Sequence, residues 1–176
     1  MNPMPRAAKL ALATLLLLPL AALAKTSDRD QPMTVDAASQ NGSMLDDNGT
    51  IHYAGNVVIL QGSLEVHADA ADLYRRNGDI ERIVLTGKQA TLKQQMDDNT
   101  WMNARADNLD YNVATEVIVL TGNYKVESER GTNAGQRMVY NTRSGAMQSG
   151  GDGTRVRTVI QPKNKAPAAA ASGDNK

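Results

Sequence analysis

The amino-acid sequence predicts an all-β fold in which tandem hairpins stack into an open-ended roll. Beyond residue 24 no stretch has helical periodicity, and turn signals recur about every eight to twelve residues, a spacing typical of sandwiches, rolls and barrels. One motif also recurs three times: an apolar residue, a spacer and a glycine, then a strand-like stretch, then a small residue. A single hairpin cannot bury its apolar face alone, whereas stacked copies bury a shared one.

The three copies of this motif lie between Tyr53 and Tyr140. They begin at Tyr53-Ala54-Gly55, Leu85-Thr86-Gly87 and Leu120-Thr121-Gly122, and their small residues open Ala68-Asp69, Ala106-Asp107 and Ala134-Gly135. We interpret each copy as strand, turn, strand, with the small residue at the start of the second strand. The edge strands of such a stack lie at its two ends, where they can pair with another chain.

Residues 1–24 have the features of a cleaved export signal. A positively charged start precedes an apolar run of about fourteen residues, and Ala22-Leu23-Ala24 fits the small-x-small cleavage pattern. The run is shorter than the roughly 20 residues that span a bilayer, so we expect cleavage between Ala24 and Lys25. The exported part then consists of one domain over 25–161 and a disordered Ala/Pro-rich tail over 162–176.

The composition of the exported part limits its partners and the contents of its core. It carries seventeen basic and nineteen acidic residues, a near balance that gives no reason to expect nucleic-acid binding. The chain has no cysteine, so the fold has no disulfide support. It also has no phenylalanine and few other aromatics, so Val, Ile, Leu, Met and Ala must fill the interior.

Alternating apolar and polar residues place the first strands. We expect residues 25–31 to be loose and 33–35 to begin the alternation, followed by strands at 51–53 and 57–60 on either side of Gly55-Asn56, which forms a tight turn or a bulge. Residues 64–69 alternate most clearly, with the apolar side chains facing inward.

Turn-forming residues delimit the later strands. Asn77-Gly78 predicts a type I′ hairpin turn, because both residues tolerate the positive φ that this turn requires. Strands are expected at 80–85, 90–93, 101–104, 109–113, 117–120, 124–126, 138–140 and 146–148, and a last one at 156–160 follows the glycine-rich segment 150–153. The run 117–120 is continuously apolar, which is typical of a strand covered on both sides or lying at a packed corner.

No motif in the sequence predicts catalysis, a metal site or a cofactor. The two histidines, His52 and His67, have no carboxylate or second ligand at a spacing suited to metal binding or base catalysis. Cysteine nucleophiles, Gly-x-Ser-x-Gly elbows and phosphate-binding loops are absent from the sequence. The acidic pairs Asp46-Asp47 and Asp97-Asp98 fall in turns, where aspartate is favoured for backbone reasons. We therefore expect a protein that is not an enzyme.

Short motifs along most of the exported part resemble those of the LptA family of OstA-like proteins. In chain order they are Gln31-Pro32-Met33, Gly55-Asn56-Val57 with Gln61-Gly62, residues 64–69, residues 119–123 and residues 155–162. The resemblance implies a twisted antiparallel β-jellyroll, open at both ends, that carries lipopolysaccharide across the periplasm from the inner to the outer membrane. It also implies that rolls join end to end with further copies and with LptC-like and LptD-like partners at the two membranes.

Inward alternation and position against the family motifs together predict the lipid-binding residues. Acyl chains need continuous apolar shelter, since exposing them to water costs about 0.8 kcal/mol per methylene. The expected lining comprises Met33, Val35, Tyr53, Val57, Ile59, Leu64, Val66, Leu92, Leu109, Tyr111, Val113, Tyr124, Val126 and Tyr140. The expected interface residues, which add strands end to end, are Met33, Thr34 and Val35 at one end and Val156, Val159 and Ile160 at the other.

Two other classes of protein remain open at this point. A periplasmic glycan-binding or scaffold protein would use a similar β fold, although sugar sites normally display aromatic platforms and this chain has few aromatics. A β-structured enzyme acting on envelope polysaccharide would need a converging acid and base, which the carboxylates in turns do not obviously provide.

Overall fold

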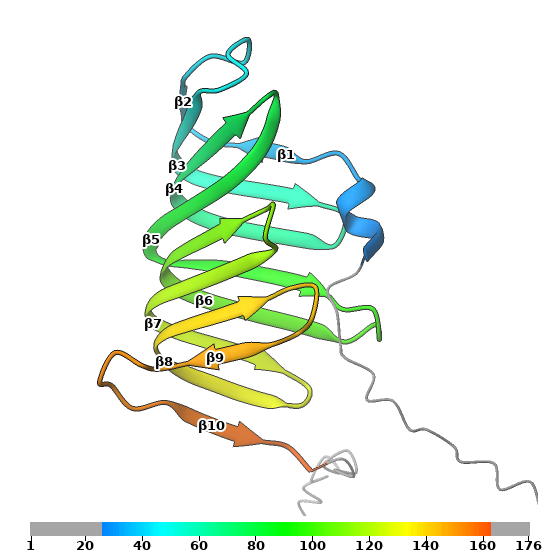
Figure 1. Cartoon of the computed structure of the whole chain (residues 1–176), viewed down its shortest axis with the longest axis vertical. Helices are drawn as coiled ribbons and strands as arrows, with labels where there is room; N and C mark the ends of the chain where they lie inside the picture. The colour runs from blue at the N-terminus through cyan, green and yellow to red at the C-terminus, as the bar shows by residue number, and fades with distance from the viewer. Residues whose placement is uncertain (1–25, 163–176) are drawn as a thin grey trace, which may run out of the picture.

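One antiparallel sheet, folded back on itself, forms nearly all of the described structure (Figure 1). The computed structural model of the protein describes residues 26–162. In chain order its elements are η1 (Thr26–Asp30), β1 (Thr34–Asp36), β2 (Ser39–Asn41), β3 (Thr50–Gln61), β4 (Leu64–Arg76), β5 (Asp79–Gln95), β6 (Trp101–Asn112), β7 (Val117–Ser128), β8 (Gly131–Asn141), β9 (Met147–Ser149) and β10 (Arg157–Ile160). The predictions of an all-β, antiparallel, unclosed fold are confirmed.

The six long strands follow one another along the long axis of the molecule (Figure 1). Each of β3 to β7 pairs with the next strand in the chain. Two short strands share each outer edge: β1 and β2 pair with β3, and β9 and β10 pair with β8. Within residues 26–162 no helix has the length and apolarity to cross a membrane.

The sheet bends along a line that crosses the middle of the long strands. The strand pairings lose register there, for example between Ala54 and Val57 in β3 and between Thr121 and Tyr124 in β7, which marks a bulge in every pair from β3/β4 to β7/β8. We call this line the corner. It divides the sheet into a first limb, which contains 50–54 of β3, and a second limb, which contains 57–61 of the same strand.

The repeated glycines lie at the corner, so of the two alternatives for Gly55-Asn56 the bulge is confirmed and the tight turn between separate strands is wrong. Gly55 and Asn56 have φ of 82° and 47°, and Gly122 and Asn123 have φ of 80° and 46°, inside strands that continue past them. A glycine followed by asparagine suits both a hairpin turn and a bulge, because each needs positive φ. The repeat therefore marks one bend in each of several strands.

In the first two copies of the motif the small residues, Ala68 and Ala106, are buried on the inside of the corner. Ala90 and Ala106 face each other across β5 and β6 and are completely buried. The aspartate that follows the alanine braces the neighbouring bulge: Asp69 Oδ2 accepts the Lys88 N–H at 2.9 Å, and Asp107 Oδ2 accepts from Asn123 Nδ2 at 3.1 Å. A strand start was expected at these alanines, but the strands run through them.

In the third copy of the motif the residue inside the corner is Gly135, one position later than the predicted Ala134. Gly135 pairs with Tyr124 and occupies the inner position, where an added Cβ would lie 3.0 Å from a carbon of the Tyr124 ring. Gln136 then takes the bracing role, because its Oε1 accepts the Asn123 N–H at 3.2 Å. The large ring of Tyr124 thus fills the space that small residues leave free.

Two further predictions concern the hairpin turn at Asn77-Gly78 and the continuously apolar run 117–120. Asn77 and Gly78, with φ of 52° and 87°, connect the paired residues Arg76 and Asp79, so the predicted hairpin turn is confirmed. Of the two alternatives for the apolar run 117–120, cover on both sides is wrong, because Leu120 is buried inside whereas Val119 pairs with Asp110 on the outer face and is half-buried. The run instead leads directly into the corner, where the register of β7 shifts after Thr121.

The segment before β1 is ordered, so the expectation that residues 25–31 are loose is wrong within the described range. Thr26–Asp30 forms η1, and Asp28 is only 5% exposed. Asp28 Oδ2 accepts a hydrogen bond from Ser63 Oγ at 2.5 Å, which attaches η1 to the β3–β4 turn. The predicted signal peptide, the cleavage between Ala24 and Lys25 and the tail from residue 163 onward lie outside the described residues.

Replacing Gly122 with alanine should lower the free energy of unfolding by about 2–3 kcal/mol, because the new side chain adopts positive φ and meets the Asp107 carboxylate. Urea unfolding followed by circular dichroism measures the change. G151A is the matched control, since Gly151 has φ of 87° with no atom within 4 Å of an added Cβ, and it should cost about 1 kcal/mol or less. Equal effects of the two variants would contradict a packed corner.

Candidate binding site

Cross-strand rows of apolar side chains line the inside of the folded sheet. The strand register places residues of successive strands beside one another, and alternation within each strand points them to one face. The first limb contributes the row Tyr53, Ala71, Leu85, Leu109, Leu120 and Met138, and the second limb contributes Ile59, Val66, Leu92, Ala104 and Val126. The hydrophobic core therefore lies between the two limbs.

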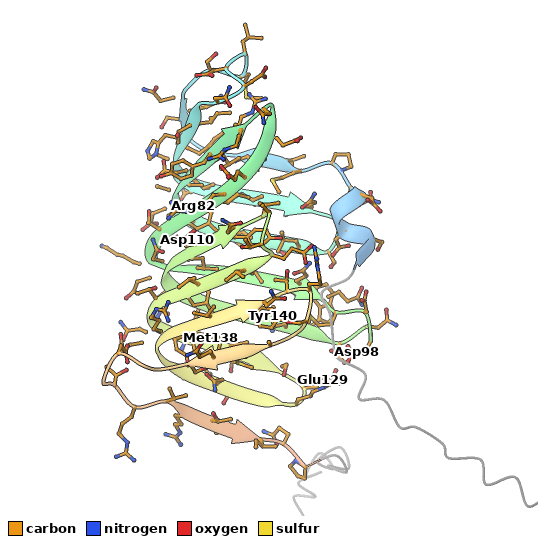
Figure 2. The ribbon with its side chains drawn as sticks, viewed as in Figure 1. Arg82, Asp98, Asp110, Glu129, Met138 and Tyr140 are labelled. Carbon is orange, nitrogen blue, oxygen red and sulfur yellow. The ribbon has the colours of Figure 1, made fainter. Side chains whose placement is uncertain are left out.

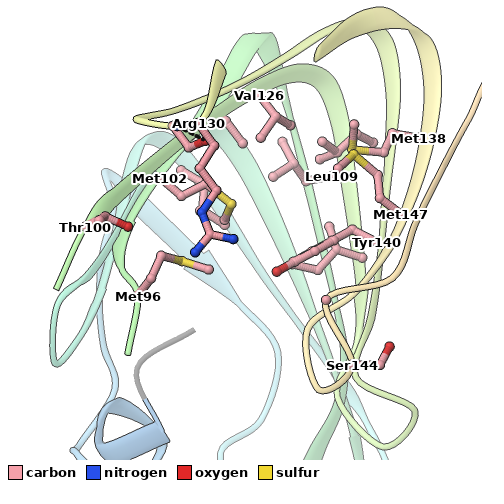
Figure 3. A pocket seen from close by; sticks show the side chains of 16 residues that line it. Met96, Thr100, Met102, Leu109, Val126, Arg130, Met138, Tyr140, Ser144 and Met147 are labelled. Carbon is pink, nitrogen blue, oxygen red and sulfur yellow. Dashed lines mark hydrogen bonds between the residues drawn. The ribbon is translucent and has the colours of Figure 1, made fainter. Parts of the chain in front are cut away.

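Two adjoining cavities lie between the limbs of the described sheet. The C-terminal cavity has a volume of about 260 Å³ and is lined by Leu92, Met96, Thr100, Met102, Ala104, Leu109, Ile118, Leu120, Val126, Ser128, Arg130, Met138, Tyr140, Ser144, Gly145 and Met147 (Figure 3). The N-terminal cavity has a volume of about 90 Å³ and reaches Asp28 of η1. Leu92, Leu109 and Ile118 line both, so the cavities adjoin one another in one apolar interior.

Most of the predicted lining residues face these cavities. Nine of the fourteen line one or both: Met33, Ile59, Leu64, Val66, Leu92, Leu109, Tyr111, Val126 and Tyr140. Their placement follows from the period-two alternation that predicted it. Whether each of them touches a lipid stays a prediction.

The other five predicted residues line neither cavity. Val57 and Tyr124 are each only 1% exposed and fill the corner, and Tyr53 is likewise buried in the core. Val35 packs against the edge of that core. Val113 follows the end of β6, where its N–H donates to the Glu81 carbonyl at 2.8 Å. Alternation alone does not distinguish a wall of a cavity from a filled corner or a strand end.

Several residues that line the cavities were not predicted from the sequence. Four are methionines of the C-terminal cavity: Met96, Met102, Met138 and Met147. Alternation from Tyr140 would have identified Met138, and alternation from Ala104 would have identified Met102. Met96 is in phase with Ala90 and Leu92, but the polar Gln94 interrupts the apolar series before it. Met147 follows a turn with no alternation before it, and Ile118 was hidden in the continuously apolar run.

Polar groups surround the mouth of the C-terminal cavity. Figure 2 shows Asp98 and Glu129, from the β5–β6 and β7–β8 turns, on the same side of the molecule. Asp98 Oδ1 accepts hydrogen bonds from the Thr100 hydroxyl at 2.6 Å and the Thr100 N–H at 3.1 Å. These bonds, with the nearby Arg130, lower the pKa of Asp98 below its ordinary value. Burial raises the pKa of Tyr140, whose side chain enters the cavity.

A cluster of hydrogen-bonded polar side chains lies near the C-terminal edge of the sheet, around Asn133 of β8. Tyr124 donates its hydroxyl proton to Asn133 Oδ1 at 2.5 Å, and Ser149 Oγ donates to the same oxygen at 3.1 Å. Asn133 Nδ2 in turn donates to Thr158 Oγ1 at 2.8 Å. The cluster joins β7, β8, β9 and β10, and it stabilises the two short edge strands on β8.

Both histidines lie on strands with half-exposed side chains, and each contacts one carboxylate. His52 Nδ1 lies 2.6 Å from Asp72 Oδ1, and His67 Nε2 lies 2.8 Å from Glu65 Oε1. The first pair forms across β3 and β4, a contact that sequence spacing cannot reveal. Half of each histidine side chain is exposed and neither lines an interior cavity. Among the described residues no group of three or more potential metal ligands converges.

The predicted interface residues lie on or beside the outermost strands. Thr34 and Val35 belong to β1 at one end of the sheet, and Val159 and Ile160 belong to β10 at the other. Ile160 is 81% exposed, and every residue of β10 is exposed. Met33 and Val156 lie directly before these strands, and Met33 also lines the N-terminal cavity.

Comparison with known proteins identifies the family. Residues 34–146 match the family described as "LptA/(LptD N-terminal domain) LPS transport protein". The chain belongs to this family. The match spans the sheet from β1 to the turn that precedes β9.

Individual members of the LptA family are similar over most of the chain. The lipopolysaccharide export system protein LptA of Escherichia coli (strain K12) is 30% identical over 153 residues, which are 85% of this chain and 82% of that protein. LptH of Pseudomonas aeruginosa is 34% identical over 155 residues, 82% of this chain and 87% of that protein. The crystal structure of LptH matches with a TM-score of 0.68 and 30% identity, and covers 77% of this chain and 99% of LptH. The predicted resemblance is confirmed.

Removing the Tyr124 hydroxyl with Y124F should lower the free energy of unfolding by about 0.5–1.5 kcal/mol, because Asn133 loses one of its partners. Y111F is the control, since the Tyr111 hydroxyl has no protein partner among the described residues, and it should change stability by less than about 0.5 kcal/mol. Thermal and urea unfolding measure both. An unchanged Y124F protein would show that the cluster does not stabilise the C-terminal edge.

Proposed function

We propose that this protein is a periplasmic carrier that binds lipopolysaccharide by its acyl chains and passes it from the inner to the outer membrane. The supporting observation is the apolar interior that Leu92, Leu109 and Ile118 make continuous from one cavity to the next. Relatives named as lipopolysaccharide export proteins, and LptH, described as a periplasmic component of the transport device, support the same assignment.

The arrangement of the limbs suits a ligand with apolar chains and a large polar head. Each methylene removed from water contributes about 0.8 kcal/mol, so a molecule with several acyl chains gains strongly from an apolar interior. The limbs join only at the corner, and Figure 3 shows the opposite side of the interior open between them. Chains can enter between the limbs while sugars stay in water.

The methionines of the C-terminal cavity favour a ligand without one fixed shape. Met side chains are unbranched and flexible, so they adapt to different apolar surfaces. Met138 is only 1% exposed, whereas Met147 is 52% exposed at the border of the same cavity. This gradient from buried to exposed methionine fits chains that slide in and out.

The strand edges support end-to-end assembly with further copies and with LptC-like and LptD-like partners. β10 presents an exposed edge at one end, and β1 and β2 present exposed edges at the other. Unpaired strand edges bind other strands through main-chain hydrogen bonds. Stacked rolls would extend the interior from one membrane toward the other.

A glycan-binding role has less support from the site. The single tryptophan, Trp101, is 41% exposed, but Lys93 Nζ lies 4.7 Å from the centre of its ring and covers one face. Neither cavity is lined by this ring. The interior walls are mainly aliphatic, and aliphatic walls do not provide the stacking that sugars use.

A photoreactive amino acid at Tyr111, in the N-terminal cavity, or at Met102, in the C-terminal cavity, should form adducts with lipopolysaccharide in cells. The adducts are detected as a mobility shift that reacts with an antibody against lipopolysaccharide. Thr121 is the control position, because it is exposed on the outer face. Adducts at none of the interior positions, or equal adducts at Thr121, would favour a scaffold over a carrier.

Deleting residues 155–176 should abolish end-to-end assembly and leave the roll folded, because β10 pairs only with β8 among the described strands. Multi-angle light scattering over a range of concentrations should show a constant monomer mass for this variant and a rising mass for the full exported chain. Deletion of 163–176 alone is the control and should preserve the rise. Unchanged assembly without β10 would exclude this edge as the interface.

A further inference from the structure

Among the described residues, Arg130 is the only charged side chain that lines the C-terminal cavity, and the carrier function does not by itself account for it. It lies in the turn between β7 and β8, on the second limb. Figure 3 shows its guanidinium extending into the opening between Met96 on one limb and Tyr140 on the other. A cation at the mouth of an apolar cavity is suited to an amphiphile with an anionic head.

The backbone of Arg130 is fixed while its side chain reaches the opening. Its N–H donates to Ser128 Oγ at 3.3 Å, and its carbonyl accepts from the Gln161 N–H at 3.0 Å. The side chain remains 64% exposed. The turn therefore presents the guanidinium at a defined place without burying it.

The guanidinium keeps donors available for a ligand. Its protein acceptor among the described residues is Asp98, where Nη2 donates to Oδ2 at 3.1 Å. Guanidinium has several N–H donors, so one carboxylate oxygen leaves most of them for other acceptors. An exposed ion pair of this kind is weak, and Asp98 is already held by Thr100, so Asp98 orients Arg130 more than it neutralises it.

The two cavities differ in the charge at their borders. The charged residue of the N-terminal cavity is Asp28, which is 5% exposed and accepts from Ser63. No cation belongs to the lining of that cavity in the described chain. An anionic head group is therefore attracted to the border of the C-terminal cavity and not to that of the N-terminal cavity. This difference would orient a bound amphiphile with its head at the C-terminal cavity.

We propose that Arg130 binds the phosphorylated head group of the amphiphile whose acyl chains occupy the C-terminal cavity. Arginine pairs bidentately with phosphate oxygens, and the Ser128 hydroxyl of the same cavity border, which only accepts from the Arg130 N–H, can donate a further hydrogen bond. The inference rests on the proposed carrier function and adds to it the recognition of a phosphate. The chains supply affinity, and Arg130 selects the head and orients it.

The test measures binding of two detergent-dispersed probes, diphosphorylated lipid A and the same lipid after removal of its phosphates, to the exported chain. R130A should weaken binding of the phosphorylated lipid about tenfold or more and leave binding of the dephosphorylated lipid unchanged. R130K should retain part of the selectivity, because it keeps the charge and loses the bidentate geometry. R105A is the matched control and should change neither affinity, because Arg105 is exposed on the outer face.

Each result separates this inference from the carrier function on which it rests. If the wild-type chain binds neither lipid, the carrier function fails. If it binds both and R130A changes neither affinity, or changes both equally, the carrier function stands and the role of Arg130 is overturned. Inorganic phosphate alone should not bind in calorimetry, and saturable phosphate binding that R130A abolishes would show a site for a free anion instead of a lipid head.

Discussion

The structure depends on a sheet that buries one of its faces against itself. No second layer of strands or helices covers the sheet in the described chain, so the apolar face must fold over to leave water. The aligned bulges allow this fold, and the fully buried Ala90 and Ala106 let the two limbs approach at the corner. Without small residues inside and positive φ at the bulges, the strands would continue straight and the core would be lost.

The residues that pack the fold and the residues that face the cavities lie in different parts of the interior. At the corner Val57 and Tyr124 are almost completely buried, so this region stabilises the fold. Farther from the corner the limbs enclose the two cavities, whose walls are aliphatic and rich in methionine. One sheet thus provides a rigid bend and an adaptable interior, because the residues that stabilise the bend differ from those that face the cavities.

Local sequence signals predicted the parts of the fold that local physics determines. The alternation in 64–69 and the Asn77-Gly78 turn were identified correctly, because period-two burial and positive φ leave direct marks in the sequence. Gly55-Asn56 was ambiguous, since the same pair suits a turn and a bulge. Contacts such as His52 with Asp72 and Asp98 with Arg130 depend on strand register and on which turns meet at one side, so the sequence could not show them.

The described strands contact mainly the strands beside them, so the molecule is nearly one-dimensional along its long axis. In such an architecture stability accumulates from neighbour to neighbour, as in repeat proteins. A pair of strands with its own bulges could be inserted or removed in the middle, and β1 and β2 at one end and β9 and β10 at the other would keep their surroundings. The span of a single subunit and the chemistry of its termini can therefore evolve independently.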